Sequence, residues 1–403
     1  MRIPNVWQAA LNFGGVSLRR LRRHGRTVAQ VCQRAGRKAR RSAETLNDAP
    51  ALVRMRVRRG RAAIGRSANR LSRFNDHVLE PRRTERRVKH RLGRAASGSG
   101  PIIVGPWTSE VGYEVLYWLP FLRWAIDRYD VDPKRVVAVS RGGTSGWYEG
   151  IAGTYVDVFD LVPPDAFAAQ AAARREQGDQ KQLAPSAFDR ELVAQACVRL
   201  GTRDAGLWHP GLMYQLFRPF WYGDRSRQFL FRHMDFRYRG ITAGAGESGL
   251  PPEYVAVKFY TGPALPPSES NRALVRDLVA CIAAETPVVV LDTAWSIDEH
   301  RDYTFDGLPG VTTLRPSLNP RTNLGVQSRV IAGARRFVGT CGGLAWLAPF
   351  LGVDTLAVYE DDRYLTAHLY AAGYAYRRNG AARFSTLNIK ALRGVMRAGA
   401  RVS

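Results

Sequence analysis

The chain has 403 residues, of which 24% are charged, and its formal net charge is +25 at pH 7. The charge is unevenly distributed: the first hundred residues hold 26 Lys and Arg against 5 Asp and Glu, a net of +21, which leaves 34 against 30, a net of +4, for the rest. A uniformly basic protein is therefore excluded, and we expect a near-neutral globular body that carries a cationic arm.

The cysteines and the hydropathy pattern indicate the compartment. Cys32, Cys197, Cys281 and Cys341 are scattered without a Cys-x-x-Cys pair. This spacing argues against a disulfide framework and against a structural zinc site, and it is typical of a reducing compartment. No apolar run approaches the ~18–20 residues of a membrane span, and the N-terminus shows no signal-peptide pattern. We expect a cytoplasmic protein.

Residues 1–96 are expected to form the arm, partly helical and basic. Val57, Ile64, Leu71 and Val78 recur every seven residues, which predicts one apolar stripe on an Arg-rich helix. Such a helix can lie on the anionic inner face of the cell membrane. The same arginines could bind nucleic-acid phosphates, or the arm could be a solvated tail. The stripe favours the membrane, because a nucleic-acid arm needs no apolar face.

Residues 97–100, with the sequence SGSG, are expected to be a flexible linker to a first α/β domain at 101–236. Apolar runs predict its strands, and helical spacing of apolar residues predicts its helices. The expected strands are 101–105, 135–140 and 155–161, and the expected helical segments are 112–129 and 166–221.

A Gly-rich stretch at 237–252 is expected to link this domain to a second α/β domain at 253–403. Strand and helix patterns alternate in both, which predicts two Rossmann-like, doubly wound domains facing a cleft. Ligands of such sheets bind beyond the carboxyl ends of the strands. The expected strands of the second domain are 254–260, 287–292, 310–314, 336–339 and, as the last, 355–359; its expected helices are 269–285, begun by Ser268 or Ser270, 323–334 and 343–351.

A glycine turn, GTCGG, connects a strand to a helix in the second domain. Free backbone N–H groups at a helix N-terminus, with glycines that permit close approach, can bind phosphate. A turn selected only for helix–sheet packing is the alternative. The turn matches neither G-x-G-x-x-G nor the P-loop, which disfavours a dehydrogenase or an ATPase. Without a nearby His, Cys341 is expected to be a turn residue rather than a nucleophile. The expected phosphate site is Gly339, Thr340, Cys341, Gly342 and Gly343.

The loop and helix after the first strand carry two acids, Glu110 and Glu114, spaced i and i+4. One acid in a first helical turn can complement the helix dipole, and the other can face the cleft and accept a proton from an attacking hydroxyl. Arg141 follows the second strand at the same edge and could bind a phosphate or another acidic group.

Residues 105–120, GPWTSEVGYEVLYWLP, resemble the opening of heptosyltransferase-type glycosyltransferases of the GT-B fold, where an acid stands six positions before Pro in G-D-x-L-x-x-x-P. Glu114 holds that place relative to Pro120. Glu replaces Asp, and Tyr113 replaces the preceding Gly, so Glu110 and Glu114 both remain candidates for the base.

Residues 337–361 resemble the donor-binding stretch of the same group: a turn, a helix, then L-G-V and a strand. The resemblance covers both halves of 101–403. It implies transfer of a hexosyl or heptosyl group from a nucleotide-sugar donor to a lipid-linked or surface-polysaccharide acceptor. The implied reaction is a direct displacement with inversion, independent of metal and of any cofactor.

The donor's diphosphate needs positive charge or aligned donors where charge develops. Lys258, at the end of a strand, could supply the charge, or its amine could simply reach solvent. Tyr260 and Thr261 follow it into the loop. Asp292, at the end of another strand, could meet a ribose or a base, or cap the next turn. Weaker donor-site candidates are Asn323 and Gln327.

No metal site is expected. The one D-x-D match, Asp130-Val131-Asp132, precedes its strand and so lies at the wrong edge, while residues 360–362 indicate a solvated acidic loop. The histidines show no ligand spacing such as H-E-x-x-H.

Two other functions stay open. A nucleotide-sugar epimerase shares the two-domain plan, although a soluble epimerase has no reason to visit a membrane. A nucleic-acid-binding protein would act through the arm, although the near-neutral body shows no known reader motif. The expected partners are a nucleotide-sugar, a glycan or lipid-linked acceptor, and an anionic membrane surface that contacts residues 1–96, with nucleic acid disfavoured.

Overall fold

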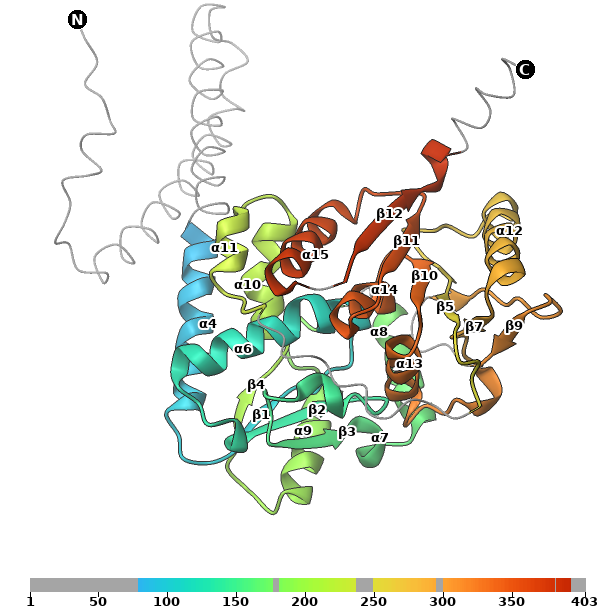
Figure 1. Ribbon diagram of the computed structural model, residues 1–403. Coiled ribbons are helices and arrows are strands. Elements are labelled where there is room, and N and C mark those ends of the chain that lie inside the picture. Colours follow the sequence, from blue (N-terminus) through green and yellow to red (C-terminus); the bar gives the residue numbers. More distant parts are fainter. Residues whose placement is uncertain (1–78, 177–180, 237–248, 295–299, 381, 393–403) are drawn as a thin grey trace, which may run out of the picture. The chain divides into compact units, whose positions relative to one another are not determined.

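The computed structural model describes residues 79–176, 181–236, 249–294, 300–380 and 382–392 (Figure 1). Residues 1–78 of the expected arm and 237–248 of the expected interdomain linker lie outside the described residues. The rest of the body forms two α/β halves, here called the N-terminal half (82–236) and the C-terminal half (249–392). Each contains a parallel sheet with helices on both faces, so the expected fold class is confirmed.

The sheet of the N-terminal half has the order β3-β2-β1-β4, with every pair parallel. Its central strands are continuous apolar runs because both faces are buried: Ile103 and Val137 pack in one cluster, and Ile102 and Val104 in another. The strands are β1 (Ile102–Val104), β2 (Val136–Ser140), β3 (Thr154–Asp157) and β4 (Gly206–Trp208).

Two details of this half differ from expectation. The expected strand 155–161 ends at Asp157, whose carboxylate accepts a hydrogen bond from Phe159 N (2.9 Å) and so caps a short helix. Within the expected helical stretch 166–221, β4 adds a strand. The helical segments are α5 (Val111–Tyr113), a π-helical turn (Glu114–Trp118), α6 (Leu119–Tyr129), α7 (Val158–Leu161), α8 (Pro164–Glu176), α9 (Ala187–Arg199), α10 (Gly211–Trp221) and α11 (Arg227–Phe231).

The sheet of the C-terminal half has the order β12-β11-β10-β5-β7-β9, again parallel throughout. The chain begins in the middle at β5, builds outward to β9, and then returns to β10 on the other side of β5. The point where the order reverses, between β5 and β10, is where doubly wound sheets bind ligands. The strands are β5 (Val255–Lys258), β7 (Val288–Val290), β9 (Val311–Thr313), β10 (Arg336–Thr340), β11 (Thr355–Tyr359) and β12 (Phe384–Asn388).

The helices of this half follow the expected pattern as far as β11. Ser268 accepts a hydrogen bond from Asn271 N (3.1 Å) and begins α12, which settles the choice between the two expected caps. The strand β11 is not the last, because a helix and β12 follow it. The remaining elements are α12 (Glu269–Glu285), α13 (Asn323–Ala332), α14 (Gly343–Leu347), α15 (Thr366–Asn379) and the antiparallel pair β6 (Tyr260–Thr261) and β8 (Arg301–Asp302).

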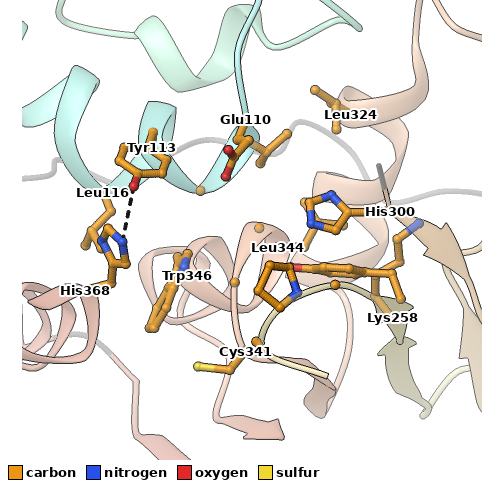
Figure 2. Close-up of a pocket in the computed structure, with 18 of the residues that line it drawn as sticks. Glu110, Tyr113, Leu116, Lys258, His300, Leu324, Cys341, Leu344, Trp346 and His368 are labelled. Carbon is orange, nitrogen blue, oxygen red and sulfur yellow. Dashed lines mark hydrogen bonds between the residues drawn. The ribbon is translucent and has the colours of Figure 1, made fainter. Parts of the chain in front are cut away.

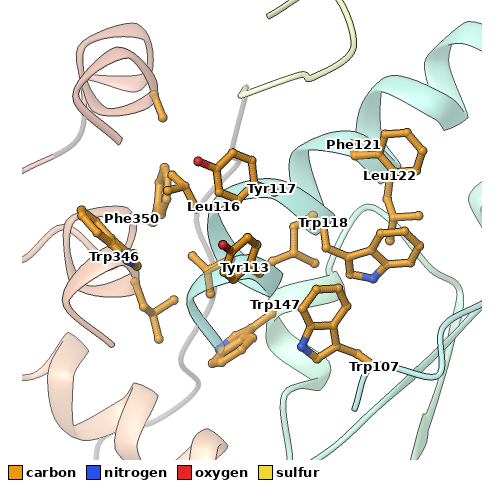
Figure 3. Packing of buried hydrophobic residues seen from close by; sticks show 14 of the residues in the cluster. Trp107, Tyr113, Leu116, Tyr117, Trp118, Phe121, Leu122, Trp147, Trp346 and Phe350 are labelled. Carbon is orange, nitrogen blue, oxygen red and sulfur yellow. The ribbon is translucent and has the colours of Figure 1, made fainter. Parts of the chain in front are cut away.

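One aromatic-rich cluster continues from one half into the other. Figure 3 shows Tyr113, Trp118 and Phe121 along the helix after β1, with Trp346 and Phe350 of the C-terminal half opposite them. Polar contacts also join the halves: Trp147 Nε1 donates to Ser328 Oγ (3.0 Å), and Gly325 N donates to Gly142 O (2.9 Å). The two halves therefore share a core.

Part of the expected arm belongs to this body. In α4 (Glu80–Ala96), Val88 and Leu92 are fully buried in the shared core, and Trp208 Nε1 donates to Leu92 O (3.2 Å). Val88 and Leu92 are spaced i and i+4, but they lie within a run of arginines, so the sequence pattern did not indicate that this helix packs on the body. No helix among the described residues is long and apolar enough to cross a membrane.

The expected flexible linker at 97–100 is tied to the body by one side chain. The Arg135 guanidinium donates to the carbonyl oxygens of Ala96 (3.2 Å) and Gly100 (3.0 and 3.2 Å), and also to that of Gly98. These bonds fix the path from α4 into β1, so this linker is shaped by a tertiary contact that its own composition does not reveal.

Candidate functional site

A pocket of about 760 Å³ lies where the two halves meet, and residues of both halves line it (Figure 2). It opens beyond the carboxyl ends of β1 and β2 in one half and of β5 and β10 in the other. This is the edge at which open parallel sheets bind ligands. The expected sites that follow these strands can therefore be compared with the pocket residue by residue.

Glu110 lines the pocket, and Figure 2 shows its carboxylate directed into it. The residue holds the N-cap position of α5, where its backbone is extended. The loop before it is fixed from three sides: Trp107 N donates to Val139 O (2.8 Å), Arg141 Nη2 to Ser109 O (2.8 Å), and Tyr214 Oη to Ser109 Oγ (3.1 Å). The carboxylate is thus presented by a well-anchored segment.

Glu114 does not line the pocket. Its side chain is 0% exposed, and its Oε1 accepts hydrogen bonds from Ser140 Oγ and Tyr148 Oη, both at 2.6 Å. Burial raises its pKa to about 7, against the opposing effects of the Arg141 charge and the two hydrogen bonds. Of the two acids predicted from the sequence, Glu110 is the one that a ligand in the pocket can reach.

Arg141 lines the same pocket and is 6% exposed. Its guanidinium lies over the Phe167 ring, 5.8 Å from the centroid, and Nη2 is bonded to Ser109 O. Its Nη1 is buried without a hydrogen-bond partner among the described residues. Leaving a buried donor unbonded costs about 1–3 kcal/mol, more for a charged group, so this atom is suited to receive an acceptor from a ligand.

The glycine turn contributes some of its residues to the pocket. Gly342 has φ 149° and Gly343 has φ 37°, and a Cβ at Gly342 would lie 2.5 Å from Tyr260 Oη, so only glycine fits. A Cβ at Gly112 of the other half would lie 3.2 Å from Gly343 N. Burial raises the pKa of the Cys341 thiol to about 12, which makes it a poor nucleophile. The residues of the turn that line the pocket are Cys341, Gly342 and Gly343.

The other two residues of the turn do not line the pocket. The Thr340 hydroxyl donates to Tyr260 O (3.0 Å) and accepts from Tyr260 N (2.9 Å), so it joins β10 to β6 instead of facing a phosphate. Gly339 lies within β10, where a Cβ would meet Lys258 O at 2.3 Å, so glycine is needed there for strand packing. The packing role considered for the turn applies to these two residues.

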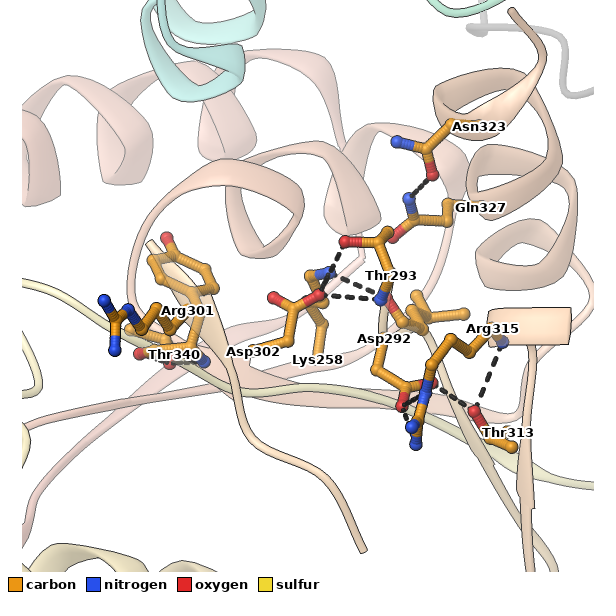
Figure 4. A network of polar contacts seen from close by, with 12 residues as sticks. Lys258, Asp292, Thr293, Arg301, Asp302, Thr313, Arg315, Asn323, Gln327 and Thr340 are labelled. Carbon is orange, nitrogen blue, oxygen red and sulfur yellow. Dashed lines mark hydrogen bonds and ion pairs between the residues drawn. The ribbon is translucent and has the colours of Figure 1, made fainter. Parts of the chain in front are cut away.

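Lys258 lines the pocket, but its charge is already balanced (Figure 4). Its Nζ donates to Leu291 O and to Asp302 Oδ2, both at 2.7 Å. The same Asp302 oxygen accepts from Thr293 N (2.8 Å) and Thr293 Oγ1 (3.0 Å). The amine is therefore held inside a network rather than extended into solvent.

Of the two donor-site candidates that follow Lys258, one lines the pocket and the other does not. Tyr260 lines the pocket, and its ring meets the edge of the His300 ring at a centroid distance of 4.5 Å. Thr261 is not among the lining residues; it pairs with Arg301 in the β6–β8 ribbon, where Thr261 Oγ1 accepts from Arg301 N (3.3 Å). Of the two, Tyr260 is the one placed to touch a ligand.

Asp292 lies outside the pocket lining, and among the described residues its carboxylate caps no turn. Its side chain is 1% exposed and accepts hydrogen bonds from Arg315 Nε (2.8 Å) and from the Thr313 hydroxyl (Figure 4). The carboxylate thus anchors β9 and the turn after it to the end of β7. The sequence predicted that Asp292 could contact a ribose or a base. In the structure its carboxylate is instead bonded to Arg315, a residue distant in the sequence.

Replacing Arg315 with Met is expected to lower the free energy of unfolding by about 3 kcal/mol, because the buried Asp292 carboxylate loses its cation. Adding Asp292→Asn should recover part of the loss. Chemical denaturation measures both, with Arg321→Met as the control, since Arg321 forms an exposed ion pair with Asp160 (3.2 Å) that is worth at most about 1 kcal/mol. Equal losses in the two Arg variants would contradict the assigned role of Arg315.

Asn323 and Gln327 both line the pocket from the first turns of α13. Gln327 Nε2 donates to Asn323 Oδ1, so the two amides form a pair (Figure 4). Gln327 Oε1 is buried and has no hydrogen-bond partner among the described residues. The pair therefore presents polar atoms to a ligand, although both residues were only weak candidates in the sequence.

The pocket also contains residues that no motif predicted. His368 of α15 faces Tyr113 and Tyr117, with Tyr113 Oη 3.3 Å from Nε2 (Figure 2) and Tyr117 Oη 2.7 Å from Nδ1. Burial, together with the nearby Lys181 charge, lowers the pKa of His368 to about 3, so the ring is neutral at pH 7. The other unpredicted lining residues include Lys181, Thr293, His300, Asp302 and Tyr364.

Within the described parts of the chain, no group of three or more His, Cys, Asp or Glu side chains is arranged to hold a metal ion. Both acids of the D-x-D match lie in turns. Asp130 ends α6 in the left-handed conformation, and the Asp132 carboxylate accepts a hydrogen bond from Lys134 N (2.9 Å).

No protein-family model matches the chain, and no curated protein matches it in sequence. Among solved structures it is similar to the E. coli ADP-heptose lipopolysaccharide heptosyltransferase II, with 12% identity and a TM-score of 0.35 over 66% of this chain and 87% of that chain. It is also similar to a family 9 glycosyl transferase from Veillonella parvula (13%, TM-score 0.34, 65% and 80%) and to an E. coli heptosyltransferase with ADP-2-deoxy-2-fluoro heptose (15%, TM-score 0.29, 69% and 99%).

Proposed function

We propose that the protein is a GT-B-type glycosyltransferase that moves a hexosyl or heptosyl group from a nucleotide-sugar donor to a hydroxyl of a glycan or lipid-linked acceptor. One observation carries the proposal: the Glu110 carboxylate faces a pocket lined by both halves, and the buried Arg141, with an unbonded Nη1, lines the same pocket. A carboxylate and a cation with a free donor in one pocket suit a reaction that removes a proton while a phosphate leaves.

In the proposed reaction, Glu110 accepts the proton of the acceptor hydroxyl as its oxygen attacks the anomeric carbon of the donor sugar. The bond from that carbon to the diphosphate oxygen breaks, and the nucleoside diphosphate leaves with the electron pair. Attack opposite the leaving group inverts the anomeric centre. Arg141 Nη1 and the backbone at Gly342 and Gly343 support this scheme as groups that can stabilise the developing phosphate charge.

We propose further that the cationic arm, residues 1–96, holds the enzyme on the anionic inner face of the cell membrane, where lipid-linked acceptors reside. The described end of this segment supports the idea, because the arginines of α4 lie on the side away from the buried Val88 and Leu92. Each basic residue near an anionic surface contributes about 1 kcal/mol of attraction. The exposed arginines of α4 are Arg82, Arg83, Arg86, Arg87, Arg91 and Arg94.

The test is thermal stabilisation of the full-length protein by UDP, GDP, ADP, CDP and CMP. A nucleotide that binds only the folded state adds about 2.7 kcal/mol at a hundred times its Kd. We expect saturable stabilisation by one of them and a weaker effect in Arg141→Met, with Arg190→Met, an exposed arginine in α9, behaving as wild type.

The absence of stabilisation by every nucleotide would contradict the proposal. Interconversion of two nucleotide-sugars without any acceptor would identify the epimerase of the same two-domain plan instead.

A further inference from the structure

Two side chains of opposite charge, Glu114 and Arg141, each leave one buried polar atom unbonded. Glu114 Oε2 and Arg141 Nη1 have no hydrogen-bond partner among the described residues, and the two side chains are 0% and 6% exposed. The other carboxylate oxygen, Oε1, is bonded to Ser140 and Tyr148, and Ser140 directly precedes Arg141 in the chain. A buried charge is costly unless it is paired, so each of the two groups is stabilised by a counter-charge.

The surroundings of Glu114 hold its carboxyl in place but leave its protonation state open. Glu114 begins the π-helical turn, a backbone form that is frequent at functional sites. Burial raises its pKa to about 7, whereas the Arg141 charge lowers it, so the carboxyl is close to half protonated at neutral pH. The titratable or charged side chains that act on it from neighbouring elements are Arg141, Tyr148, Tyr155, Asp157 and Tyr214. Burial raises the pKa of the three tyrosines, which are therefore neutral, and Arg141 is the cation of this set.

The charge of Glu114 and the binding of an anion at Arg141 therefore influence each other. An ionised Glu114 balances part of the Arg141 charge and repels a phosphate that approaches it. A protonated Glu114 leaves the guanidinium without that counter-charge, so the cation attracts the phosphate more strongly. The effect is reciprocal: a phosphate bound at Arg141 cancels the positive charge that favours the carboxylate and so raises the pKa of Glu114.

We propose that Glu114 is a positioning residue that takes up a proton when the phosphate of the donor binds at Arg141, and that its ionisation weakens this binding. The proposal rests on the proposed transferase function and adds a pH-dependent control of the same site. Glu114 acts through Arg141, because it does not line the pocket and touches no ligand. The proton comes from the solvent and goes to a carboxyl oxygen, and no bond of the sugar is involved.

The experiment measures the Kd of the full-length protein for UDP, GDP, ADP, CDP and CMP by calorimetry at pH 6, 7 and 8.5, in wild type and in Glu114→Gln. Glutamine is neutral at each pH and reproduces the protonated carboxyl. We expect similar Kd values at pH 6, whereas at pH 8.5 wild type binds about tenfold more weakly than Glu114→Gln, the effect of a one-unit change in pKa. Titration of the nucleotide itself is common to both proteins and cancels.

Two further variants test the role of the carboxyl while retaining it. Tyr148→Phe removes one hydrogen bond that favours the carboxylate, so the loss of affinity should move to higher pH. Glu191→Gln, an exposed residue of α9, should follow wild type. In an Arg141→Met background, Glu114→Gln should change the Kd at pH 8.5 by about twofold at most, because the coupling passes through Arg141.

A ratio of wild-type to Glu114→Gln Kd that is the same at all three pH values would overturn the proposal, as would a tenfold effect that persists in the Arg141→Met background. Failure of every nucleotide at every pH would instead count against the proposed function. Sulfate, whose charge is constant over this range, then serves as the probe of Arg141. Its saturable binding should weaken from pH 6 to pH 8.5 in wild type and stay constant in Glu114→Gln. No sulfate binding, or the same pH dependence in both proteins, would overturn the proposal.

Discussion

Replacing Glu110 with Gln is expected to lower the rate of sugar transfer by about 10²–10⁴-fold while nucleotide binding stays intact. The amide keeps the shape of the side chain but cannot accept the proton of the acceptor hydroxyl, and the carboxylate is the one that Figure 2 shows directed into the pocket. Release of nucleoside diphosphate in the presence of acceptor measures the rate, and thermal stabilisation by the nucleotide measures binding.

The control for this prediction is Glu191→Gln, because Glu191 is exposed on α9 and lies outside the pocket lining. It should transfer sugar at the wild-type rate. Wild-type turnover in Glu110→Gln would show that another group takes the proton. A loss of nucleotide binding together with turnover would show that Glu110 serves binding instead of the chemical step.

Glu114→Gln is expected to raise the free energy of unfolding at pH 8 by up to about 3 kcal/mol and to change it little at pH 4.5. Burial lifts the pKa of Glu114 from its ordinary 4.5 to about 7, so the folded state favours the protonated carboxyl. Stability therefore falls as the pH rises from about 4.5 to 7, and the full cost of a buried charge is present above pH 7. Glutamine is neutral throughout, and its carbonyl oxygen can still accept from Ser140 and Tyr148.

Denaturant titrations of both proteins at pH 4.5, 6 and 8 measure this difference. Every other titrating group is shared, so the difference between the two curves reports Glu114 itself. Parallel curves across the whole range would mean that Glu114 has the same pKa in the folded and the unfolded state, against the expected upward shift. Activity should change less in Glu114→Gln than in Glu110→Gln, since Glu114 has no access to the pocket.

The sequence predicted the sheets well where an entire strand is buried, because runs such as 136–140 and 288–290 are apolar on both faces. It missed β4, whose three residues Gly206–Trp208 are too short to show a period, and β12, which alternates weakly. It also assigned α4 to the arm, because two buried apolar residues carry little weight among so many arginines.

The candidate site was predictable to the extent that it depends on strand ends. Glu110, Arg141 and the residues 341–343 follow strands of the two sheets, and all of them line the pocket. Asp292 follows β7 and Thr340 ends β10, yet Arg315 and the Tyr260 backbone form hydrogen bonds with their polar atoms. Sequence position gives the edge of the sheet, whereas only tertiary packing decides which side chain is left for a ligand.

Lys181 and His368 could not have been found in this way, since neither follows a strand or belongs to a motif. Lys181 reaches the pocket because Gln182 fastens its segment to the loop after β1, and His368 because α15 packs against Tyr113 and Tyr117. Both residues lie more than sixty positions from their partners in the sequence. No helix or strand periodicity relates residues so far apart, so a sequence pattern cannot predict these contacts.

The contact of Gly112 with Gly343 has an evolutionary consequence. Each glycine belongs to a different half, and a side chain at Gly112 would press on the backbone of Gly343 and on Trp346, whose Cδ1 would lie 3.0 Å away. A larger residue at position 112 therefore requires the glycine turn or the indole to move. Substitutions at these positions are expected to occur together among descendants of this gene, so that drift in one half is constrained by the other.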